Sequence, residues 1–208
     1  MYAVHISFKV YAVNMAPAYH HGDLRAALVT AALALLEAGE TAPSLREVAR
    51  AAGVSAMAPY RHFADRAALL AAVADEGFAA LRTRLLDADD APESREALIA
   101  QGRAYVDFAL AHPALFRLMF SHEKAGGVPE DETAYTVLAN RVAQLAPDRA
   151  EAATLAAWGL VHGLATLLLD AKLDALHRSG VDATLDLLVD GMMSGGSSKG
   201  STGQPRSA

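Results

Sequence analysis

The segment from Ser44 to Val73, SLREVARAAGVSAMAPYRHFADRAALLAAV, changes helical phase twice, at AAGVS and at HFADR. Ser44 and Glu47 have the spacing of a capping box, in which each side chain satisfies a free backbone N–H of the first helical turn. Gly53 follows the apolar face of that helix and can take the left-handed conformation that ends it. Ser55 can cap the next helix at once. The segment therefore predicts two short helices joined by a tight turn containing glycine, which is the spacing of a helix-turn-helix.

The composition favours helices in the rest of the chain. Hydrophobic residues make up 53% of the 208 residues and aromatic residues only 6%, while β-branched runs are few. A sequence rich in Ala and Leu has high helix propensity and enough apolar content for a packed core. We therefore expect an all-α protein, with an N-terminal three-helix helix-turn-helix domain followed by a C-terminal helical bundle.

Apolar periodicity places the individual helices. The first helix starts after Asp23 and ends before Gly39, with Leu28 on its apolar stripe. Asp65 can cap a long helix that follows the second break. We expect helices at 66–86, 93–111, 113–120, 131–145, 148–177 and 182–193, with a loop at 123–130.

Composition shifts mark the ends of the folded region. The leader MYAVHISFKVYAVN alternates like a strand without a partner strand nearby, and Met15 follows it directly. We expect this leader to be disordered or to precede the true start. The Gly/Ser-rich tail cannot bury enough apolar surface to order itself. The expected divisions are the leader at 1–14, a helix-turn-helix domain at 15–66, a connecting helix at 67–86, a C-terminal domain at 87–193 and the tail at 194–208.

Charge is unevenly distributed along the chain. Residues 15–86 carry seven basic and seven acidic residues, whereas 87–208 carry ten basic and seventeen acidic residues. Within 44–66, four arginines stand against two carboxylates. Screening confines the relevant field to roughly 10 Å, so a basic island in an acidic protein can still bind a polyanion. The four arginines are Arg46, Arg50, Arg61 and Arg66.

Other function classes lack their sequence signals. The chain has no cysteine, and its eight histidines show no convincing metal-ligand spacing, so we expect no metal site. It has no phosphate-binding glycine loop, nucleophile elbow or acid/base pair at diagnostic spacing, so we expect neither an enzyme nor a cofactor. No apolar run reaches the roughly 18 residues of a membrane span, and the leader lacks signal-peptide features. We therefore expect a cytoplasmic protein without membrane contact.

The run from Leu24 through Leu70 resembles the DNA-binding domain of the tetracycline-repressor (TetR) family. The resemblance is carried above all by LREVARAAGVSAMAPYRHFADRAALL, with its glycine turn, its Tyr60 and Phe63 pair and the basic residue after the second break. It implies a three-helix DNA-binding domain and a C-terminal helical domain that dimerises and holds a small effector. It also implies, for most members, repression that the effector relieves.

A second resemblance concerns the C-terminal part. The stretches AYVDFALAHPALFRLMF and AWGLVHGLATLLLD are similar to the branch of the family whose C-terminal domain is named for Trp, His and Gly (WHG). The matching residues are Trp158, His162 and Gly163. Membership of this branch does not define a ligand.

The helix after the glycine turn is the candidate for base recognition. Arg61 is its single bidentate donor, and its small apolar residues suit contact with thymine methyl groups, so we expect modest hydrogen-bond readout supplemented by DNA shape. Pro59 leaves the register open, because proline lacks an N–H and strains the preceding turn. Alternatively, Tyr60 is mainly a core aromatic. The expected DNA contacts are Ser55, Ala56, Met57, Ala58 and Arg61, with Ser44, Tyr60, His62 and Arg66 on phosphates by resemblance to the family.

Aromatic and soft apolar residues of the C-terminal part are the candidate effector contacts, because small-molecule sites are mostly apolar with few polar groups. The same spacing also suits a plain helical core, and His162 can be a hydrogen-bonded core histidine. Asp107 and Arg117 are further polar candidates. The expected ligand contacts are Tyr105, Phe108, Phe116, Met119, Phe120, Trp158 and His162.

The helix expected at 148–177 is apolar on nearly every face, which predicts burial on several sides. Gly159 and Gly163, four residues apart, permit close helix approach, so we expect an isologous homodimer. Its two DNA-binding domains would read half-sites roughly 34 to 36 Å apart in an inverted repeat. The expected interface residues are Gly159, Gly163, Leu167, Leu185, Leu188 and Met192.

Three hypotheses follow. The chain is a transcription regulator, most simply a repressor released from a palindromic operator when a small apolar effector moves the long connecting helix. Alternatively, it is an enzyme on a helical scaffold, or an interaction module that has lost DNA binding. The weakly polar recognition segment and Pro59 keep the last alternative open.

Overall fold

The computed structural model describes residues 24–40, 42–89, 94–121, 133–173 and 180–194. Every regular element in these residues is a helix, so the expected all-α fold is confirmed. The expected leader and almost all of the expected tail lie outside the described residues. The elements are α1 (Leu24–Glu37), α2 (Leu45–Ala51), η1 (Pro59–Arg61), α3 (Arg66–Ala88), α4 (Ser94–Ala111), α5 (Pro113–Ser121), α6 (Ala134–Leu145), η3 (Pro147–Arg149), α7 (Ala150–Leu169) and α9 (Val181–Ser194).

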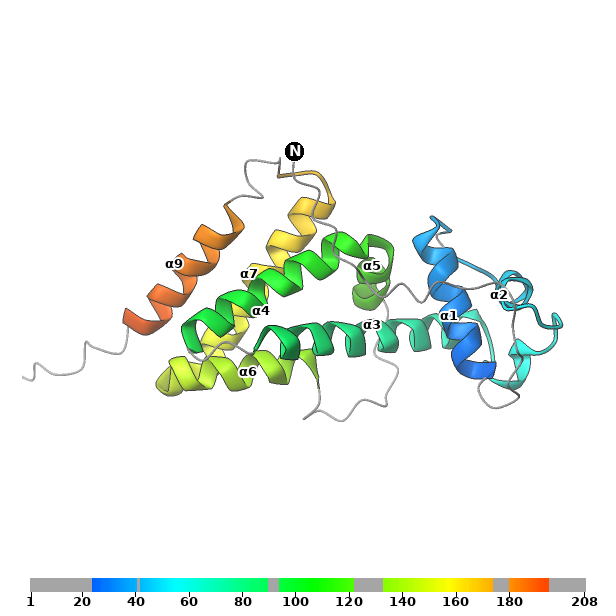
Figure 1. The fold of residues 1–208 in the computed structure, drawn as a ribbon, viewed down its shortest axis with the longest axis horizontal. Coiled ribbons are helices and arrows are strands. Elements are labelled where there is room, and N and C mark those ends of the chain that lie inside the picture. The colour runs from blue at the N-terminus through cyan, green and yellow to red at the C-terminus, as the bar shows by residue number, and fades with distance from the viewer. Residues whose placement is uncertain (1–23, 41, 90–93, 122–132, 174–179, 195–208) are drawn as a thin grey trace, which may run out of the picture.

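Helix α3 runs along the length of the molecule (Figure 1). At one end it packs against α1, which also contacts α2. At the other end it packs against α4 and α6, and α4 in turn contacts α7 and α9. Helix α5 contacts both α1 and α3, between the two ends. The arrangement places the helix-turn-helix segment at one extremity and connects it to the bundle mainly through α3.

Local hydrogen bonds explain the ends of the short N-terminal helices. The backbone N–H of Ser44 donates to the Glu47 carboxylate at 2.7 Å, and the Glu47 N–H donates to Ser44 Oγ at 3.3 Å, which confirms the capping box. Gly53 has a φ of 70°, and its N–H donates to the Arg50 carbonyl. This left-handed conformation strains any residue with a Cβ atom. The expected turn is therefore formed by the residues that the sequence assigned to it.

The helix expected after Ser55 is not an α-helix. The chain between α2 and α3 makes successive turns that include the 3₁₀-helix η1. The Ala58 N–H donates to the Ser55 carbonyl at 2.9 Å. Pro59 has no N–H to donate to the same carbonyl and its ring crowds it, so an α-helical ladder cannot begin there. The prediction of a recognition α-helix is wrong, and the segment between α2 and α3 is a series of turns.

Helix α7 ends earlier than expected, at Leu169. Ala171 has a φ of 52°, and the Lys172 N–H donates to the Leu167 carbonyl at 2.9 Å, which together make a left-handed helix ending. Alanine disfavours this conformation, so the sequence contained no glycine signal for the stop. The prediction of one helix over 148–177 is wrong, and helices α4, α5, α6 and α9 lie close to their expected positions.

The stretch Pro147–Leu169 is long and apolar enough to cross a membrane by length and composition alone, although no uninterrupted apolar run of that length occurs. Core helices of soluble proteins meet the same criterion. Helix α7, which makes up most of this stretch, packs against α4 and α6. The stretch is therefore weak evidence for a membrane span.

Candidate functional site

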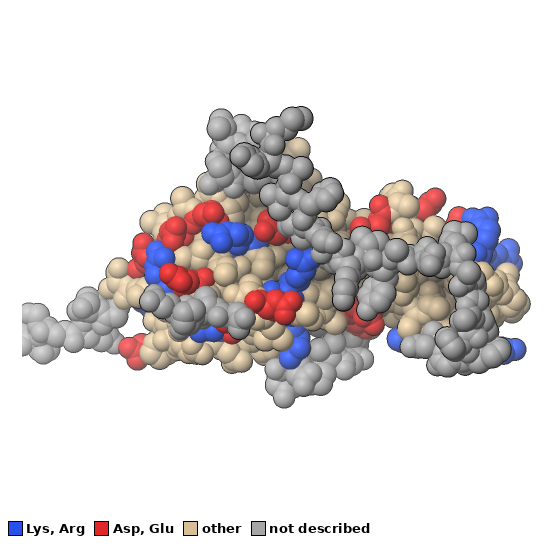
Figure 2. Space-filling view, in the orientation of Figure 1, with Lys and Arg blue, Asp and Glu red and all other residues tan. Residues whose placement is uncertain are grey.

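The turn segment between α2 and α3 forms an exposed surface at one end of the molecule. Met57 is 70% exposed and Tyr60 is 46% exposed, so the interpretation of Tyr60 as a core aromatic is not supported. Figure 2 shows Lys and Arg side chains at this end. The exposed candidates are Ser55, Ala56, Met57, Tyr60, Arg61, His62 and Arg66, whereas Ser44 and Ala58 are half-buried.

Phe63 anchors this surface from below. Its side chain is 2% exposed, and the buried Pro59 lies at the start of η1. The guanidinium carbon of Arg25 on α1 lies 5.4 Å from the centroid of the Phe63 ring, which is cation–π geometry. Burial raises the pKa of Asp75 on α3, and the nearby charge of Arg25 lowers it in part. Arg25 thus contacts the turn segment and lies near α3, a role that periodicity did not indicate.

Ser44 is positioned by its own cap. Its N–H holds the Glu47 carboxylate, and this backbone hydrogen bond is the main reason that the pKa of Glu47 lies below its usual range. Ser44 Oγ accepts from the Glu47 N–H, so its own hydroxyl hydrogen is available to donate to a phosphate. The cap is therefore compatible with the phosphate contact that the family resemblance implies for Ser44.

The expected effector residues assemble around His162 on α7. Its ring centroid lies 4.5 Å from that of Phe120 and 5.5 Å from that of Phe116. The Tyr105 and Phe116 rings meet edge to face at 5.8 Å. Tyr105, Phe116 and Met119 are at most 5% exposed, while Phe120 is 36% exposed. Most of this set is packed core, with Phe120 at its solvent side.

One further ring extends this aromatic cluster, and two expected members contact other rings. Phe78 on α3 meets Phe120 edge to face at 5.4 Å, and the sequence analysis missed it although it lies on the apolar stripe of α3. Trp158 is 36% exposed and its ring lies 5.4 Å from that of Tyr135 on α6. Phe108 is buried and packs on His112, with ring centroids 5.2 Å apart.

Tyr105 and His162 form the polar part of the cluster. The Tyr105 hydroxyl lies 2.9 Å from His162 Nδ1. Burial raises the pKa of Tyr105, and a hydrogen bond with the Trp158 side chain opposes that rise. Which of these two groups donates depends on the tautomer of His162. Burial also lowers the pKa of His162, which favours its neutral form.

Replacing His162 by asparagine should flatten the pH dependence of stability. Because burial lowers the folded-state pKa of His162, the unfolded chain binds more protons below about pH 6.5, and stability falls as the pH falls through this range. The asparagine keeps a side-chain hydrogen-bonding group for Tyr105 and does not titrate. Urea denaturation from about pH 7 to about pH 5.5 should show a loss in the wild type that is smaller in His162→Asn. Parallel profiles for the two proteins would contradict the assignment.

The exposed stripe of α7 differs in part from the expected dimer residues. A Cβ atom built on Gly159 or Gly163 meets no atom within 4 Å, so both glycines face open space. Leu155 is 63% exposed and Leu167 is 43% exposed on the same helix. On α9, Leu187 is 75% exposed and Leu188 is half-buried. The sequence analysis omitted Leu155 and Leu187.

Leu185 and Met192, two of the expected interface residues, are buried within the chain. Leu185 is 2% exposed and Met192 is 7% exposed. A Cβ atom on Gly102 of α4 would lie 2.7 Å from Leu185 Cδ2, so these two helices are in close contact. Covered side chains of this kind contribute to the protomer core, and we no longer assign them to a dimer interface.

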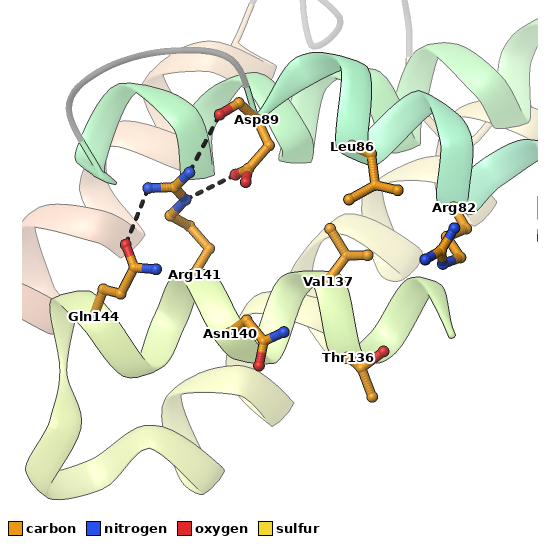
Figure 3. A pocket seen from close by; sticks show the side chains of 8 residues that line it. All are labelled: Arg82, Leu86, Asp89, Thr136, Val137, Asn140, Arg141 and Gln144. Atoms are coloured by element: carbon orange, nitrogen blue, oxygen red, sulfur yellow. Dashed lines mark hydrogen bonds and ion pairs between the residues drawn. The ribbon is translucent and has the colours of Figure 1, made fainter. Parts of the chain in front are cut away.

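A polar cleft, which the sequence analysis did not foresee, lies between α3 and α6 (Figure 3). Its volume is about 150 Å³. Among the described residues, no group of three or more His, Asp or Glu side chains is placed to hold a metal ion. The cleft is lined by Arg82, Leu86, Asp89, Thr136, Val137, Asn140, Arg141 and Gln144.

Two family models match this chain. One, described as bacterial regulatory proteins of the tetR family, matches residues 28–73, and the other, a tetracyclin repressor-like C-terminal domain, matches residues 98–192. Together they span more than half of the chain and name the same family. The chain belongs to the tetracycline-repressor family. This TetR-family chain is thus a DNA-binding transcription regulator with a helix-turn-helix domain.

Solved structures of similar chains share this fold. A protein of unknown function from Rhodococcus sp. RHA1 is 36% identical, with a TM-score of 0.68, over 86% of this TetR-family chain and 98% of its own. BioQ from Mycobacterium smegmatis is 26% identical, with a TM-score of 0.59, and the match covers 84% of this chain and 98% of BioQ. A TetR variant from Acinetobacter baumannii AYE in complex with minocycline is 23% identical, with a TM-score of 0.59, over 80% and 94%, and shows the shared fold. No curated protein sequence matches this chain.

Proposed function

We propose that this TetR-family regulator is a homodimeric repressor that binds an inverted-repeat operator and releases it when a small apolar effector binds. The observation that carries the proposal is the turn segment between α2 and α3, which exposes seven of the nine candidate DNA contacts above the buried Phe63. Phosphate contacts from such a surface orient the protein, and base contacts supply specificity. The short η1 favours readout by a few side chains together with DNA shape.

The exposed stripe of α7 supports the homodimer. Leu155, Gly159, Gly163 and Leu167 recur every four residues and share one face of the helix. Leucines on an open helix face lose contact with water when a second copy covers them, and the glycines allow the helices to approach closely. In a symmetric dimer, two turn segments would address half-sites about one DNA turn apart, roughly 34 to 36 Å.

The aromatic cluster around His162 supports an apolar effector. Phe120 and Trp158 are each 36% exposed at its edge, so a ligand can reach the cluster by displacing Phe120. Phe120 also packs on Phe78 of α3, the helix that leads to the DNA-binding end. A ligand that moves these rings would shift α3 and lower operator affinity by a coupling free energy of about 1 to 3 kcal/mol.

A second link joins the DNA-binding end to the bundle. His112 Nδ1, next to the end of α4, lies 2.7 Å from Glu37 Oε1 at the end of α1. Helix α5 also contacts α1 directly. These contacts support transmission from the effector core to α1 as well as through α3. We further infer that the C-terminal domain belongs to the WHG branch, since Trp158, His162 and Gly163 match the residues that name it. We also infer that the protein acts in the cytoplasm.

Fluorescence anisotropy with DNA from upstream of the protein's own gene tests the proposal. We expect selective binding over a scrambled duplex, two protomers per palindrome and a steep fall in affinity with salt. Adding candidate apolar effectors should then lower the affinity. Equal, weak binding to both duplexes, together with no enrichment of any site from genomic DNA, would instead support the interaction module without DNA binding.

Arg61→Ala should weaken operator binding by about 10- to 100-fold and relax base preference at one position of each half-site, because a bidentate contact to a guanine contributes about 1 to 3 kcal/mol. The matched control is Arg103→Ala, which removes an exposed arginine that pairs with Asp182. Arg103 belongs to α4, which lies in the bundle away from α2 (Figure 1). Competition binding with single-base operator variants measures both effects. Unchanged affinity and base preference for Arg61→Ala would exclude Arg61 from base readout.

A further inference from the structure

We propose that the cleft between α3 and α6 is a binding site for a small organic monocarboxylate, with Arg82 as its anion contact. This site is separate from the aromatic cluster and does not depend on the proposed effector mechanism. Its walls come from the C-terminal half of α3 and from α6 (Figure 3).

Arg82 is the charged group of the cleft that lacks a partner. Its Nε atom is buried and has no hydrogen-bond partner among the described residues. A buried donor without a partner is unfavourable, and no acceptor of the described residues holds the Arg82 side chain in place. The two terminal nitrogens of the planar guanidinium lie side by side, which matches the two oxygens of a carboxylate, and Arg82 lines the cleft.

The other charges of the cleft neutralise one another. Arg141 Nε donates to Asp89 Oδ1 at 2.7 Å, and its terminal nitrogens donate to the Asp89 carbonyl and to Gln144 Oε1. Gln101 also donates to Asp89 Oδ1 at 2.7 Å. Arg141 is only 13% exposed, so it closes one end of the cleft as a bonded wall. The lining residues therefore retain one uncompensated positive charge, on Arg82.

Size and shape restrict the ligand. The volume of about 150 Å³ is comparable to cavities that hold one benzene molecule. Leu86 and Val137 lie between Arg82 and the closed end and supply apolar surface for a short hydrocarbon body (Figure 3). Asn140 adds an amide on the α6 side. A carboxylate on about four to seven carbon atoms, such as butyrate or benzoate, fits these features.

The position of the cleft suggests what such a ligand would affect. Arg82 and Leu86 lie on the last turns of α3, whose first residue, Arg66, borders the DNA-binding turn segment. An acid held between α3 and α6 would bias the position of the helix that connects the bundle to the DNA-binding end.

Isothermal titration calorimetry of the full-length protein with sodium benzoate at neutral pH tests the site. We expect saturable one-site binding, weakened about tenfold or more in Arg82→Ala, because hydrogen bonds to charged groups are the strong contacts here. Arg82→Lys, which keeps the charge without the fork, should fall between the two. Arg103→Ala is the matched control and should bind as the wild type does. Thermal unfolding of each variant verifies that it is folded.

Benzamide, the neutral counterpart of benzoate, provides the second arm of the test. Recognition through Arg82 predicts that benzamide binds at least about tenfold more weakly than benzoate, and that Arg82→Ala removes this difference. Equal binding of the two compounds to the wild type would overturn the proposal. So would unchanged benzoate affinity in a folded Arg82→Ala protein, or the absence of saturable binding of both benzoate and butyrate.

Discussion

Replacing Phe63 by alanine is expected to lower the free energy of unfolding by about 3 to 5 kcal/mol. The ring is 2% exposed beneath the turn segment, and Arg25 of α1 lies over its face. Its removal leaves a cavity that the surrounding backbone cannot close easily, because Pro59 stiffens the turn beside it. Urea denaturation followed by circular dichroism measures the change.

Two control variants accompany Phe63→Ala. Phe63→Leu keeps most of the apolar volume and should cost about 1.5 kcal/mol or less. Met57→Ala changes a side chain that is 70% exposed in the same segment and should alter stability by about 0.5 kcal/mol at most. A loss for Phe63→Ala no larger than that for Met57→Ala would show that the ring does not anchor the DNA-binding surface.

Gly159→Glu is expected to weaken dimerisation by about a hundredfold or more, because the symmetric interface would place two like charges at a point of close helix approach. Within one protomer the new Cβ atom meets no other atom within 4 Å. The monomer should therefore stay folded. Sedimentation velocity measures the association, and anisotropy should show a parallel loss of affinity for the full palindrome.

Ala80→Glu is the matched control for this variant, because it adds the same charge to an exposed position on α3. It should leave both the dimer and the stability of the protomer unchanged. A Gly159→Glu protein that remains dimeric would remove the α7 stripe from the interface, and an Ala80→Glu protein that dissociates would place the interface on α3.

Local features of this fold were predictable because they involve atoms only a few residues apart. The capping box of Ser44 and Glu47 and the left-handed Gly53 follow from side chains and backbone groups within one turn of each other. The Asp65 cap on the Ala68 N–H, at 2.8 Å, is of the same kind. These features located the helix-turn-helix segment and supported the family resemblance. The family model for the C-terminal domain extends the match to residue 192.

Other local features were misjudged because two preferences competed. The helical pattern after Ser55 outweighed Pro59 in the sequence prediction. In the structure, the missing N–H of Pro59 prevents an α-helix there. Apolar periodicity continued past Leu169, although the chain turns at Ala171 without glycine. In both places the hydrophobic pattern says which residues prefer burial but does not determine where the hydrogen-bond ladder stops.

The sequence by itself determined the all-α class, the ends of the first helices and the position of the DNA-binding segment, because propensity, caps and periodicity act over one or two turns. Only the tertiary structure decided that Arg25 covers Phe63, that Leu185 is buried on Gly102 and that Arg82 faces an open cleft. Apolar stripes show that a helix needs partners, but the choice of partner depends on shape and on contacts between residues far apart in the chain.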